Sequence, residues 1–146
     1  VEIAVRALSP GVNDPFTAIS CVDHLGSALC RLAQRELPSP YRHDRQDQLR
    51  LIAPVITFAE ITDAAFNQIR QYGRSSAAVT IRMLEMISVI AEFAHRPEQR
   101  AALLRHADMI ARGARDGLPE VEDRGAVEEA YQAACQACRK PARPGP

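Results

Sequence analysis

The chain has 146 residues, a length typical of one domain with a proper hydrophobic core. Hydrophobic residues make up 47% and charged residues 25% of it, as in an ordinary globular protein, and 18 basic residues balance 18 acidic ones. This balance argues against a strongly basic nucleic-acid-binding protein, and no apolar run approaches the roughly 20 residues of a membrane-spanning helix. Composition therefore excludes several classes of protein and selects no chemistry.

The first elements in chain order are two helices separated by a break. Residues 1–8 have the pattern of the end of a helix, which residues 9–11 (Ser-Pro-Gly) interrupt. Residues 13–15 (Asn-Asp-Pro) then have the form of a helix start, with a side-chain acceptor at the cap and Pro at the first helical position. Apolar residues spaced three and four apart predict an amphipathic helix of about 20 residues from there. In the break we expect Gly11 to supply a positive φ.

Residues 37–56 differ in kind, because Pro38, Pro40 and Pro54 exclude a regular helix. They predict either a small β-hairpin or an extended excursion over the surface.

A further helix is predicted to start at Thr57, because Thr57 and Glu60, three positions later, have the pattern of a capping box. We expect Gly73 to end this helix in a left-handed turn. Ser75 or Ser76 is then placed to cap the next helix, whose apolar residues leave little polar surface. That helix is our candidate for the centre of the bundle.

Two more helices complete the pattern. Pro97 starts one that ends near Gly113 or Gly117, and the last runs from about residue 123 to 139. We therefore predict an all-α domain over residues 1–140, a single helical bundle of five or six helices, followed by a flexible tail over residues 141–146.

The most information-dense segment of the chain is the break between the first two helices. Its hydrogen-bonding side chains are explained by a structural role at the helix start, with Asn13 or Asp14 as the cap. The alternative is a small-ligand pocket between the helices near this junction, and the carboxylate of Asp14 argues against an anion there. The candidate ligand-binding residues are Ser9, Asn13, Asp14, Thr17, Arg70, Gln71 and Tyr72.

The basic residues are 17 Arg and one Lys. Guanidinium groups fit phosphate oxygens well, and a cluster of them would indicate phosphate recognition. These arginines are spread along the chain among equal numbers of carboxylates, so we attribute them to genome composition.

Four cysteines are present, and we expect reduced, partly buried thiols. Cys135 and Cys138 form a Cys-x-x-Cys pair, but no second ligand pair and no preceding strand accompany it. Two small helix residues explain the pair better than half a zinc site or a redox pair does. No His spacing typical of a metalloenzyme helix occurs, so we expect neither a metal nor a cofactor.

Catalytic patterns are equally sparse. Cys21 and His24 are three residues apart and share one helical face, which keeps open a hydrolase with Ser9 or Cys21 as nucleophile and His24 as base. Nothing else in the sequence positions such a set. We therefore assign no catalytic residue and favour a protein without enzymatic activity.

A resemblance adds to this interpretation. Residues 1–18 (VEIAVRALSPGVNDPFTA) resemble the signature of the domain-of-unknown-function 2254 family, which consists of predicted bacterial membrane proteins. Residues 37–42 (LPSPYR), 52–54 (IAP) and 68–73 (QIRQYG) resemble the same family in the same order. The resemblance covers about residues 1–94, and it implies membrane-spanning segments upstream and no particular activity.

The chain also starts without Met, in the middle of an apolar pattern, which predicts a fragment of a longer protein. We expect a non-enzymatic soluble domain of a bacterial membrane protein, serving assembly, regulation or partner contact. A small-molecule sensor with a pocket near residues 9–17 is the alternative. The expected partner is its own upstream membrane-spanning region, with a homo-oligomer as a further option and no nucleic acid. Reduced thiols favour a domain that faces the cytoplasm, and a periplasmic position stays open.

Overall fold

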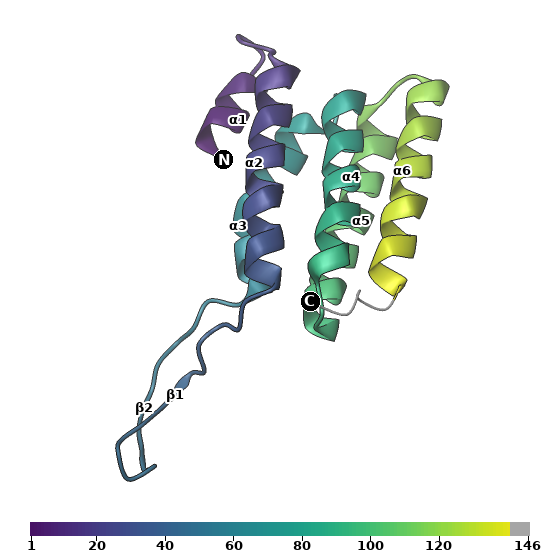
Figure 1. The fold of residues 1–146 in the computed structure, drawn as a ribbon. Coiled ribbons are helices and arrows are strands. Elements are labelled where there is room, and N and C mark those ends of the chain that lie inside the picture. Colours follow the sequence, from purple (N-terminus) through teal and green to yellow (C-terminus); the bar gives the residue numbers. More distant parts are fainter. Residues whose placement is uncertain (141–146) are drawn as a thin grey trace.

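The computed structural model describes residues 1–140, which form a helical bundle (Figure 1). The long helices run alternately in opposite directions, as their short connections require. This architecture confirms the predicted all-α class. The tail expected over residues 141–146 lies outside the described residues. The elements are α1 (Glu2–Ala7), α2 (Pro15–Ala33), β1 (Tyr41–His43), β2 (Leu49–Ile52), α3 (Phe58–Gly73), α4 (Ala77–Phe93), α5 (Pro97–Gly117) and α6 (Val121–Arg139).

Helix α4 occupies the centre of the bundle, as its sequence predicts. It packs against α2, α5 and α6, and also touches α3. A helix that is apolar on most sides is stable only where other helices cover it. Its buried residues are Val79, Thr80, Met83, Leu84, Met86, Ile87, Ile90 and Ala91.

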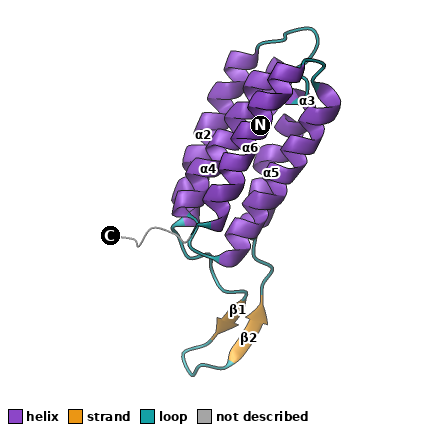
Figure 2. Cartoon of the chain, turned by 90° about the vertical axis from the view of Figure 1, so that its right-hand side faces the viewer, coloured by secondary structure: helices purple, strands orange, loops and turns teal. Residues whose placement is uncertain are grey.

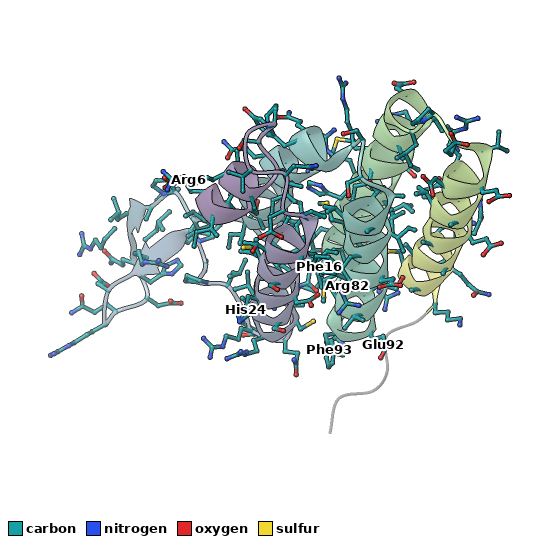
Figure 3. The ribbon with its side chains drawn as sticks, turned by 90° about the horizontal axis from the view of Figure 1, so that it is seen from above. Arg6, Phe16, His24, Arg82, Glu92 and Phe93 are labelled. Atoms are coloured by element: carbon teal, nitrogen blue, oxygen red, sulfur yellow. The ribbon has the colours of Figure 1, made fainter. Side chains whose placement is uncertain are left out.

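Helix α4 packs against α2 at Gly26. A Cβ atom at this position would lie 2.1 Å from Sδ of Met86. The two helices therefore depend on the absence of a side chain at Gly26. About one turn away on the same faces of the two helices, Arg82 Nε donates to Asp23 Oδ1 of α2 at 2.6 Å, which links α4 to α2 near the surface; Figure 3 labels Arg82 on α4.

The turn between α1 and α2 differs from the prediction in one respect. Asn13 adopts the positive φ, at 47°, and no glycine among residues 1–140 does. The expectation for Gly11 was wrong, because Asn is also tolerated in the left-handed region and here stands directly before the cap. Asp14 is the cap, since its Oδ1 accepts from the backbone N–H of Thr17 at 3.1 Å.

The structure confirms the predicted start of α3 and corrects the predicted role of Gly73 at its end. Thr57 and Glu60 form the complete capping box at its start. Gly73 does not end the helix in a left-handed turn, and Arg74 follows it with right-handed angles. Gly73 instead permits close packing, because a Cβ there would lie 2.9 Å from Cγ1 of Val79. Ser76 is at the N-cap of α4 as expected, but its side chain makes no capping hydrogen bond.

Of the two structures predicted for residues 37–56, the structure confirms the β-hairpin. Strands β1 and β2 pair antiparallel and project from the end of the bundle where α2 finishes and α3 begins (Figures 1 and 2). Tyr41 pairs with Ile52, and every strand residue is exposed. Asp44 holds the turn, since it accepts from the backbone N–H of Gln46 and from Nε of Arg50.

Arg100 of α5 joins the ends of two other helices. Its guanidinium donates to the carbonyl oxygens of Ala91 and Ala94 at the end of α4. It also donates to those of Cys138 and Lys140 at the end of α6. Carbonyl groups at a helix C-terminus lack partners within the helix and carry partial negative charge, so one cation caps both ends.

Candidate functional site

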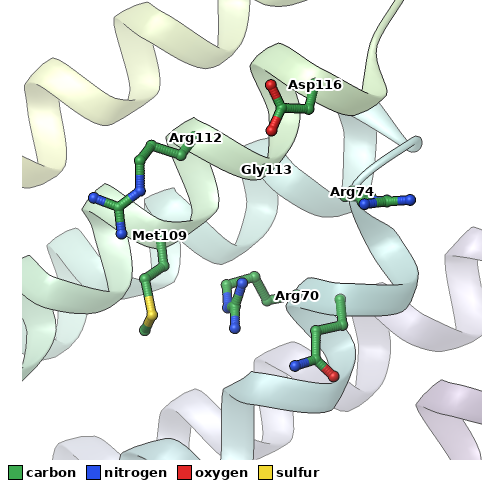
Figure 4. A pocket seen from close by; sticks show the side chains of 7 residues that line it. Arg70, Arg74, Met109, Arg112, Gly113 and Asp116 are labelled. Atoms are coloured by element: carbon green, nitrogen blue, oxygen red, sulfur yellow. The ribbon is translucent and has the colours of Figure 1, made fainter.

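A cavity of about 370 Å³ lies between α3 and the second half of α5 (Figure 4). Its volume falls within the range of roughly 300–1,000 Å³ that small-molecule sites occupy. Residues three and four apart share a helix face, which explains why residues 70 and 74 line the cavity on one side and residues 109, 112, 113 and 116 line it on the other. The lining residues are Arg70, Gln71, Arg74, Met109, Arg112, Gly113 and Asp116.

The charges around this cavity are unbalanced. Arg70, Arg74 and Arg112 supply three positive charges, and Asp116 supplies one negative charge. None of these four residues takes part in an ion pair within the described part of the chain. Arginines that are dispersed in the sequence are thus gathered by the packing of α3 against α5.

Arg70 is the most constrained of the three cations. Its Nε is buried and has no hydrogen-bond partner among residues 1–140. Its Nη2 makes only a long contact of 3.5 Å with Oδ1 of Asn67. Burial lowers the pKa of Arg70, and the nearby cations Arg112 and Arg105 lower it further. A buried donor without a partner costs about 1–3 kcal/mol, so this side chain sits in an unfavourable place unless something binds to it.

The nearest carboxylate on α3 is already engaged elsewhere. Oδ1 of Asp63 lies 2.6 Å from Nη2 of Arg105 and 2.8 Å from Nε2 of His106, whose side chain is fully buried. Burial raises the pKa of Asp63, but the hydrogen bonds from these two residues outweigh it and lower the pKa overall. Burial lowers the pKa of His106, so its ring is neutral near pH 7 and Nε2–H donates to Asp63. Asp63 therefore forms no ion pair with the cavity arginines, and its charge raises the pKa of Arg70 by less than burial and the neighbouring cations lower it.

The structure places the candidate residues at one end of the bundle but not in one cavity. Arg70 and Gln71 line the cavity, whereas Tyr72 is 52% exposed and does not line it. The α1–α2 turn lies beside the end of α3, because Cδ1 of Leu8 is 3.5 Å from where a Cβ at Gly73 would be.

The hydrogen bonds of the polar side chains in that turn are local to the turn and its flanking helices, and none reaches a residue that lines the cavity. Ser9 Oγ donates to the carbonyl of Arg6 at 2.7 Å, and Thr17 Oγ1 donates to Oδ2 of Asp14 at 2.5 Å. The hydroxyl of Thr17, followed by its backbone N–H, lowers the pKa of Asp14. Asn13 is exposed in its left-handed conformation. A ligand-binding role for Ser9, Asn13, Asp14 and Thr17 stays a prediction.

The residues of the hydrolase hypothesis do not bond to each other. His24 lies on the exposed side of α2 (Figure 3), with Nδ1 2.7 Å from the carbonyl oxygen of Ser20. Ser9 donates to backbone as described, and no hydrogen bond between Cys21 and His24 occurs within the described chain. These contacts give the hypothesis no support.

All four cysteines are free thiols, and Cys135 and Cys138 are buried in α6. Burial, followed by the neighbouring Cys135, raises the pKa of Cys138 to about 11. A thiol with so high a pKa is a poor nucleophile at neutral pH. Across residues 1–140, no group of three or more His, Cys, Asp and Glu side chains is placed to hold a metal ion.

Sequence reasoning missed the α5 side of the cavity and also Arg74. The signal available was the spacing of Met109, Arg112, Gly113 and Asp116 along one helical face. That spacing alone does not reveal which other helix the face meets.

Comparison with known proteins places this architecture in a family. A family model described as "Predicted membrane protein (DUF2254)" matches residues 1–88, more than half of the chain. The chain belongs to the DUF2254 family. An uncharacterised protein of Mycobacterium bovis and two of Mycobacterium tuberculosis strains are each 35% identical to it over 141 residues, or 97% of the chain. No solved structure matches it.

This DUF2254 chain spans 27% of the length of those mycobacterial relatives. The family match includes the α3 side of the cavity, and the mycobacterial alignments extend through α5 as well. Among the helices of residues 1–140, none combines the length and the apolar character needed to cross a bilayer.

Proposed function

We propose that this part of the protein is a non-catalytic regulatory domain that binds an anionic small molecule between α3 and α5. The observation that carries the proposal is the gathering of Arg70, Arg74 and Arg112 around one cavity without an ion pair in the described chain. The charge of Arg112 lies close enough to Arg70 to lower its pKa, and a bound anion would replace this repulsion with attraction. Guanidinium groups also present paired donors that match the oxygens of phosphate and carboxylate groups.

Regulation follows from where the cavity lies. Arg70 belongs to α3 and Arg112 to α5, so one anion would contact both helices at once. A ligand that binds only one arrangement of two elements stabilises that arrangement by mass action. Anion binding would thereby fix the packing of α3 against α5, and a fixed bundle can pass a signal to the rest of the chain.

The proposed setting follows the sequence analysis. The domain is a soluble part of a bacterial membrane protein, and it faces the cytoplasm, where its four free thiols stay reduced. Its principal partner is the membrane-spanning region of its own protein, and a homo-oligomer would bring several such sites together.

The test is thermal unfolding of the chain in the presence of inorganic pyrophosphate. We expect pyrophosphate to raise the melting temperature of the wild type and to have little effect on Arg70→Gln or Arg112→Gln. Arg31→Gln is the matched control, because Arg31 is an exposed arginine of α2 away from the cavity. An equal response in all four proteins, or no response in the wild type, would refute the proposal.

Contact with the membrane-embedded part of the protein is a second candidate function, favoured by the hairpin. Tyr41, Leu51 and Ile52 are each more than half exposed on a ribbon that projects from the bundle. A two-stranded ribbon is only marginally stable in water, so a contact along it would stabilise the protein. Replacement of Leu51 and Ile52 by Ser in the full-length protein should weaken crosslinking from residue 46 to the membrane-embedded part. Unchanged crosslinking would argue against this role.

A further inference from the structure

The cavity between α3 and α5 contains one group that a simple anion does not explain. Asp116 lines the same cavity as the three arginines, yet its carboxylate makes no hydrogen bond or ion pair with any residue of the described chain. A carboxylate accepts hydrogen bonds and donates none. It therefore favours a ligand that brings donors of its own, and it repels a bare oxyanion.

Arg112 and Asp116 start from separate positions along α5. They are four residues apart, which corresponds to a backbone rise of about 6 Å, and their side chains point in different directions (Figure 4). With single bonds of about 1.5 Å, a ligand that reaches both needs a chain of about three or more carbon atoms between its anionic group and its hydroxyl. The anionic group would lie at Arg70 and Arg112, and the hydroxyl would lie at Asp116.

The wall between these two ends is largely apolar. Met109 offers a flexible thioether chain that packs against carbon atoms. Gly113 adds no side chain to the wall, and a Cβ there would be in ordinary contact with Cβ of Arg74 at 3.7 Å. The cavity of about 370 Å³ thus has room for a carbon skeleton and not only for an oxyanion.

We infer that the ligand is a phosphate ester of a small polyol, with its phosphate at Arg70 and Arg112 and a hydroxyl donating to Asp116. This inference rests on the proposed anion-binding function and specifies its ligand class. The shared chemistry, a phosphate with a hydroxyl a few carbon atoms away, occurs both in free polyol phosphates and in the headgroup of phosphatidylglycerol. The test distinguishes these two sources.

The first arm compares sn-glycerol 3-phosphate with inorganic phosphate by calorimetry on the wild type and on Asp116→Asn. We expect the wild type to prefer glycerol phosphate by about tenfold, the size of one hydrogen bond to a charged acceptor. Asp116→Asn should lower the affinity for glycerol phosphate by a similar factor. The affinity for inorganic phosphate should stay the same or rise, because the variant lacks the carboxylate that repels it. Asp116 is exposed, so the variant should fold normally, and its unfolding curve serves as the control.

The second arm measures co-sedimentation with vesicles of phosphatidylglycerol in phosphatidylcholine. Binding that is lost in both Arg112→Gln and Asp116→Asn, without affinity for free glycerol phosphate, assigns the site to the lipid headgroup and supports the shared chemistry. Two results together overturn the inference and leave anion binding intact. In the first arm, glycerol phosphate and inorganic phosphate bind equally, or Asp116→Asn changes the binding of both equally. In the second arm, Asp116→Asn does not change vesicle binding. If neither pyrophosphate nor any of these ligands binds, the proposed function itself fails.

Discussion

Gly117 of α5 lies against the main chain of Arg74, the residue that follows α3. A Cβ atom at position 117 would be 2.5 Å from the carbonyl oxygen of Arg74 and 2.9 Å from its carbonyl carbon. Backbone atoms cannot move aside as the end of a flexible side chain can. The end of α5 therefore holds the α3–α4 turn in place and with it one of the three arginines of the cavity.

Gly117→Ala tests this relationship. The added methyl group must push α5 away from Arg74, and we expect a loss of about 1–3 kcal/mol in the free energy of unfolding, as for other overpacked sites. Pyrophosphate binding should weaken as well, because Arg74 moves relative to Arg70 and Arg112.

The matched control is Gly125→Ala in α6, where nothing lies within 4 Å of the new Cβ. Alanine favours a helix over glycine, so this variant should gain about 0.5–1 kcal/mol. Urea unfolding of both variants decides the matter, and equal stabilities would contradict the account.

Gly26 and Met86 allow a second prediction at the contact between α2 and α4. Gly26→Ala should cost about 1 kcal/mol, less than Gly117→Ala, since the new methyl group would lie 2.1 Å from Cγ and Sδ of Met86, a flexible side chain that must shift. In the double variant with Met86→Ala the space is vacated, so the two changes should cost less together than the sum of their separate effects. A double-mutant cycle by urea unfolding measures this coupling, and strict additivity would show that the two residues do not compete for space.

The local elements of this fold were predictable because their signals lie within a few residues. The capping box of Thr57 and Glu60 and the start of α2 at Pro15 are examples. The role of Gly73 was not predictable, because a left-handed turn and a close contact both select a residue without a Cβ. Only the position of Val79 in three dimensions shows that Gly73 serves contact. Gly11 has neither a positive φ nor a neighbour within 4 Å of an added Cβ, so nothing in the structure requires a glycine there.

Only the α3 side of the cavity was predictable from the sequence, because the α5 side depends on how the two helices pack. Arg70 and Gln71 were candidates, but their partners on α5 come about 40 residues later and meet them only through the antiparallel packing of two helices. Sequence periodicity identifies the buried face of each helix without pairing the faces. The arginines are therefore dispersed in the sequence, although three of them line one cavity in the structure.

Arg100 gives a third prediction. Arg100→Ala removes the donors that cap the ends of α4 and α6, and we expect a loss of about 1.5–3 kcal/mol in the free energy of unfolding, the range for hydrogen bonds to a charged group. Arg100→Lys should recover only part of it, because an ammonium group lacks the planar fork that reaches several carbonyls. Arg31→Ala, at an exposed arginine in the last turn of α2, should leave the free energy of unfolding nearly unchanged. Full recovery by lysine would reject this assignment.

His106 predicts a dependence of stability on pH. Burial holds its pKa in the folded protein below the ordinary 6.5, so the unfolded chain takes up a proton first as the pH falls. The contribution of the neutral ring is thus complete above pH 6.5 and is lost as the pH falls below it, by at most about 1.4 kcal/mol per pH unit.

Urea unfolding between pH 7.5 and 5.5 measures this effect, with His106→Gln as the comparison. Glutamine keeps a donor for Asp63 and does not titrate, so the variant should show a flatter pH profile. The other histidines, His24, His43 and His95, are exposed. Identical slopes for the two proteins would exclude His106 as the source.

The central claim is that an anion binds between α3 and α5, and arginine side-chain NMR tests it most directly. A titration of the ¹⁵N-labelled chain with pyrophosphate should shift the Nε–H signals of Arg70 and Arg112 along one saturable curve. The signal of Arg31 should stay in place. Signals of Arg70 and Arg112 that do not move, or that move no more than that of Arg31, would contradict the account.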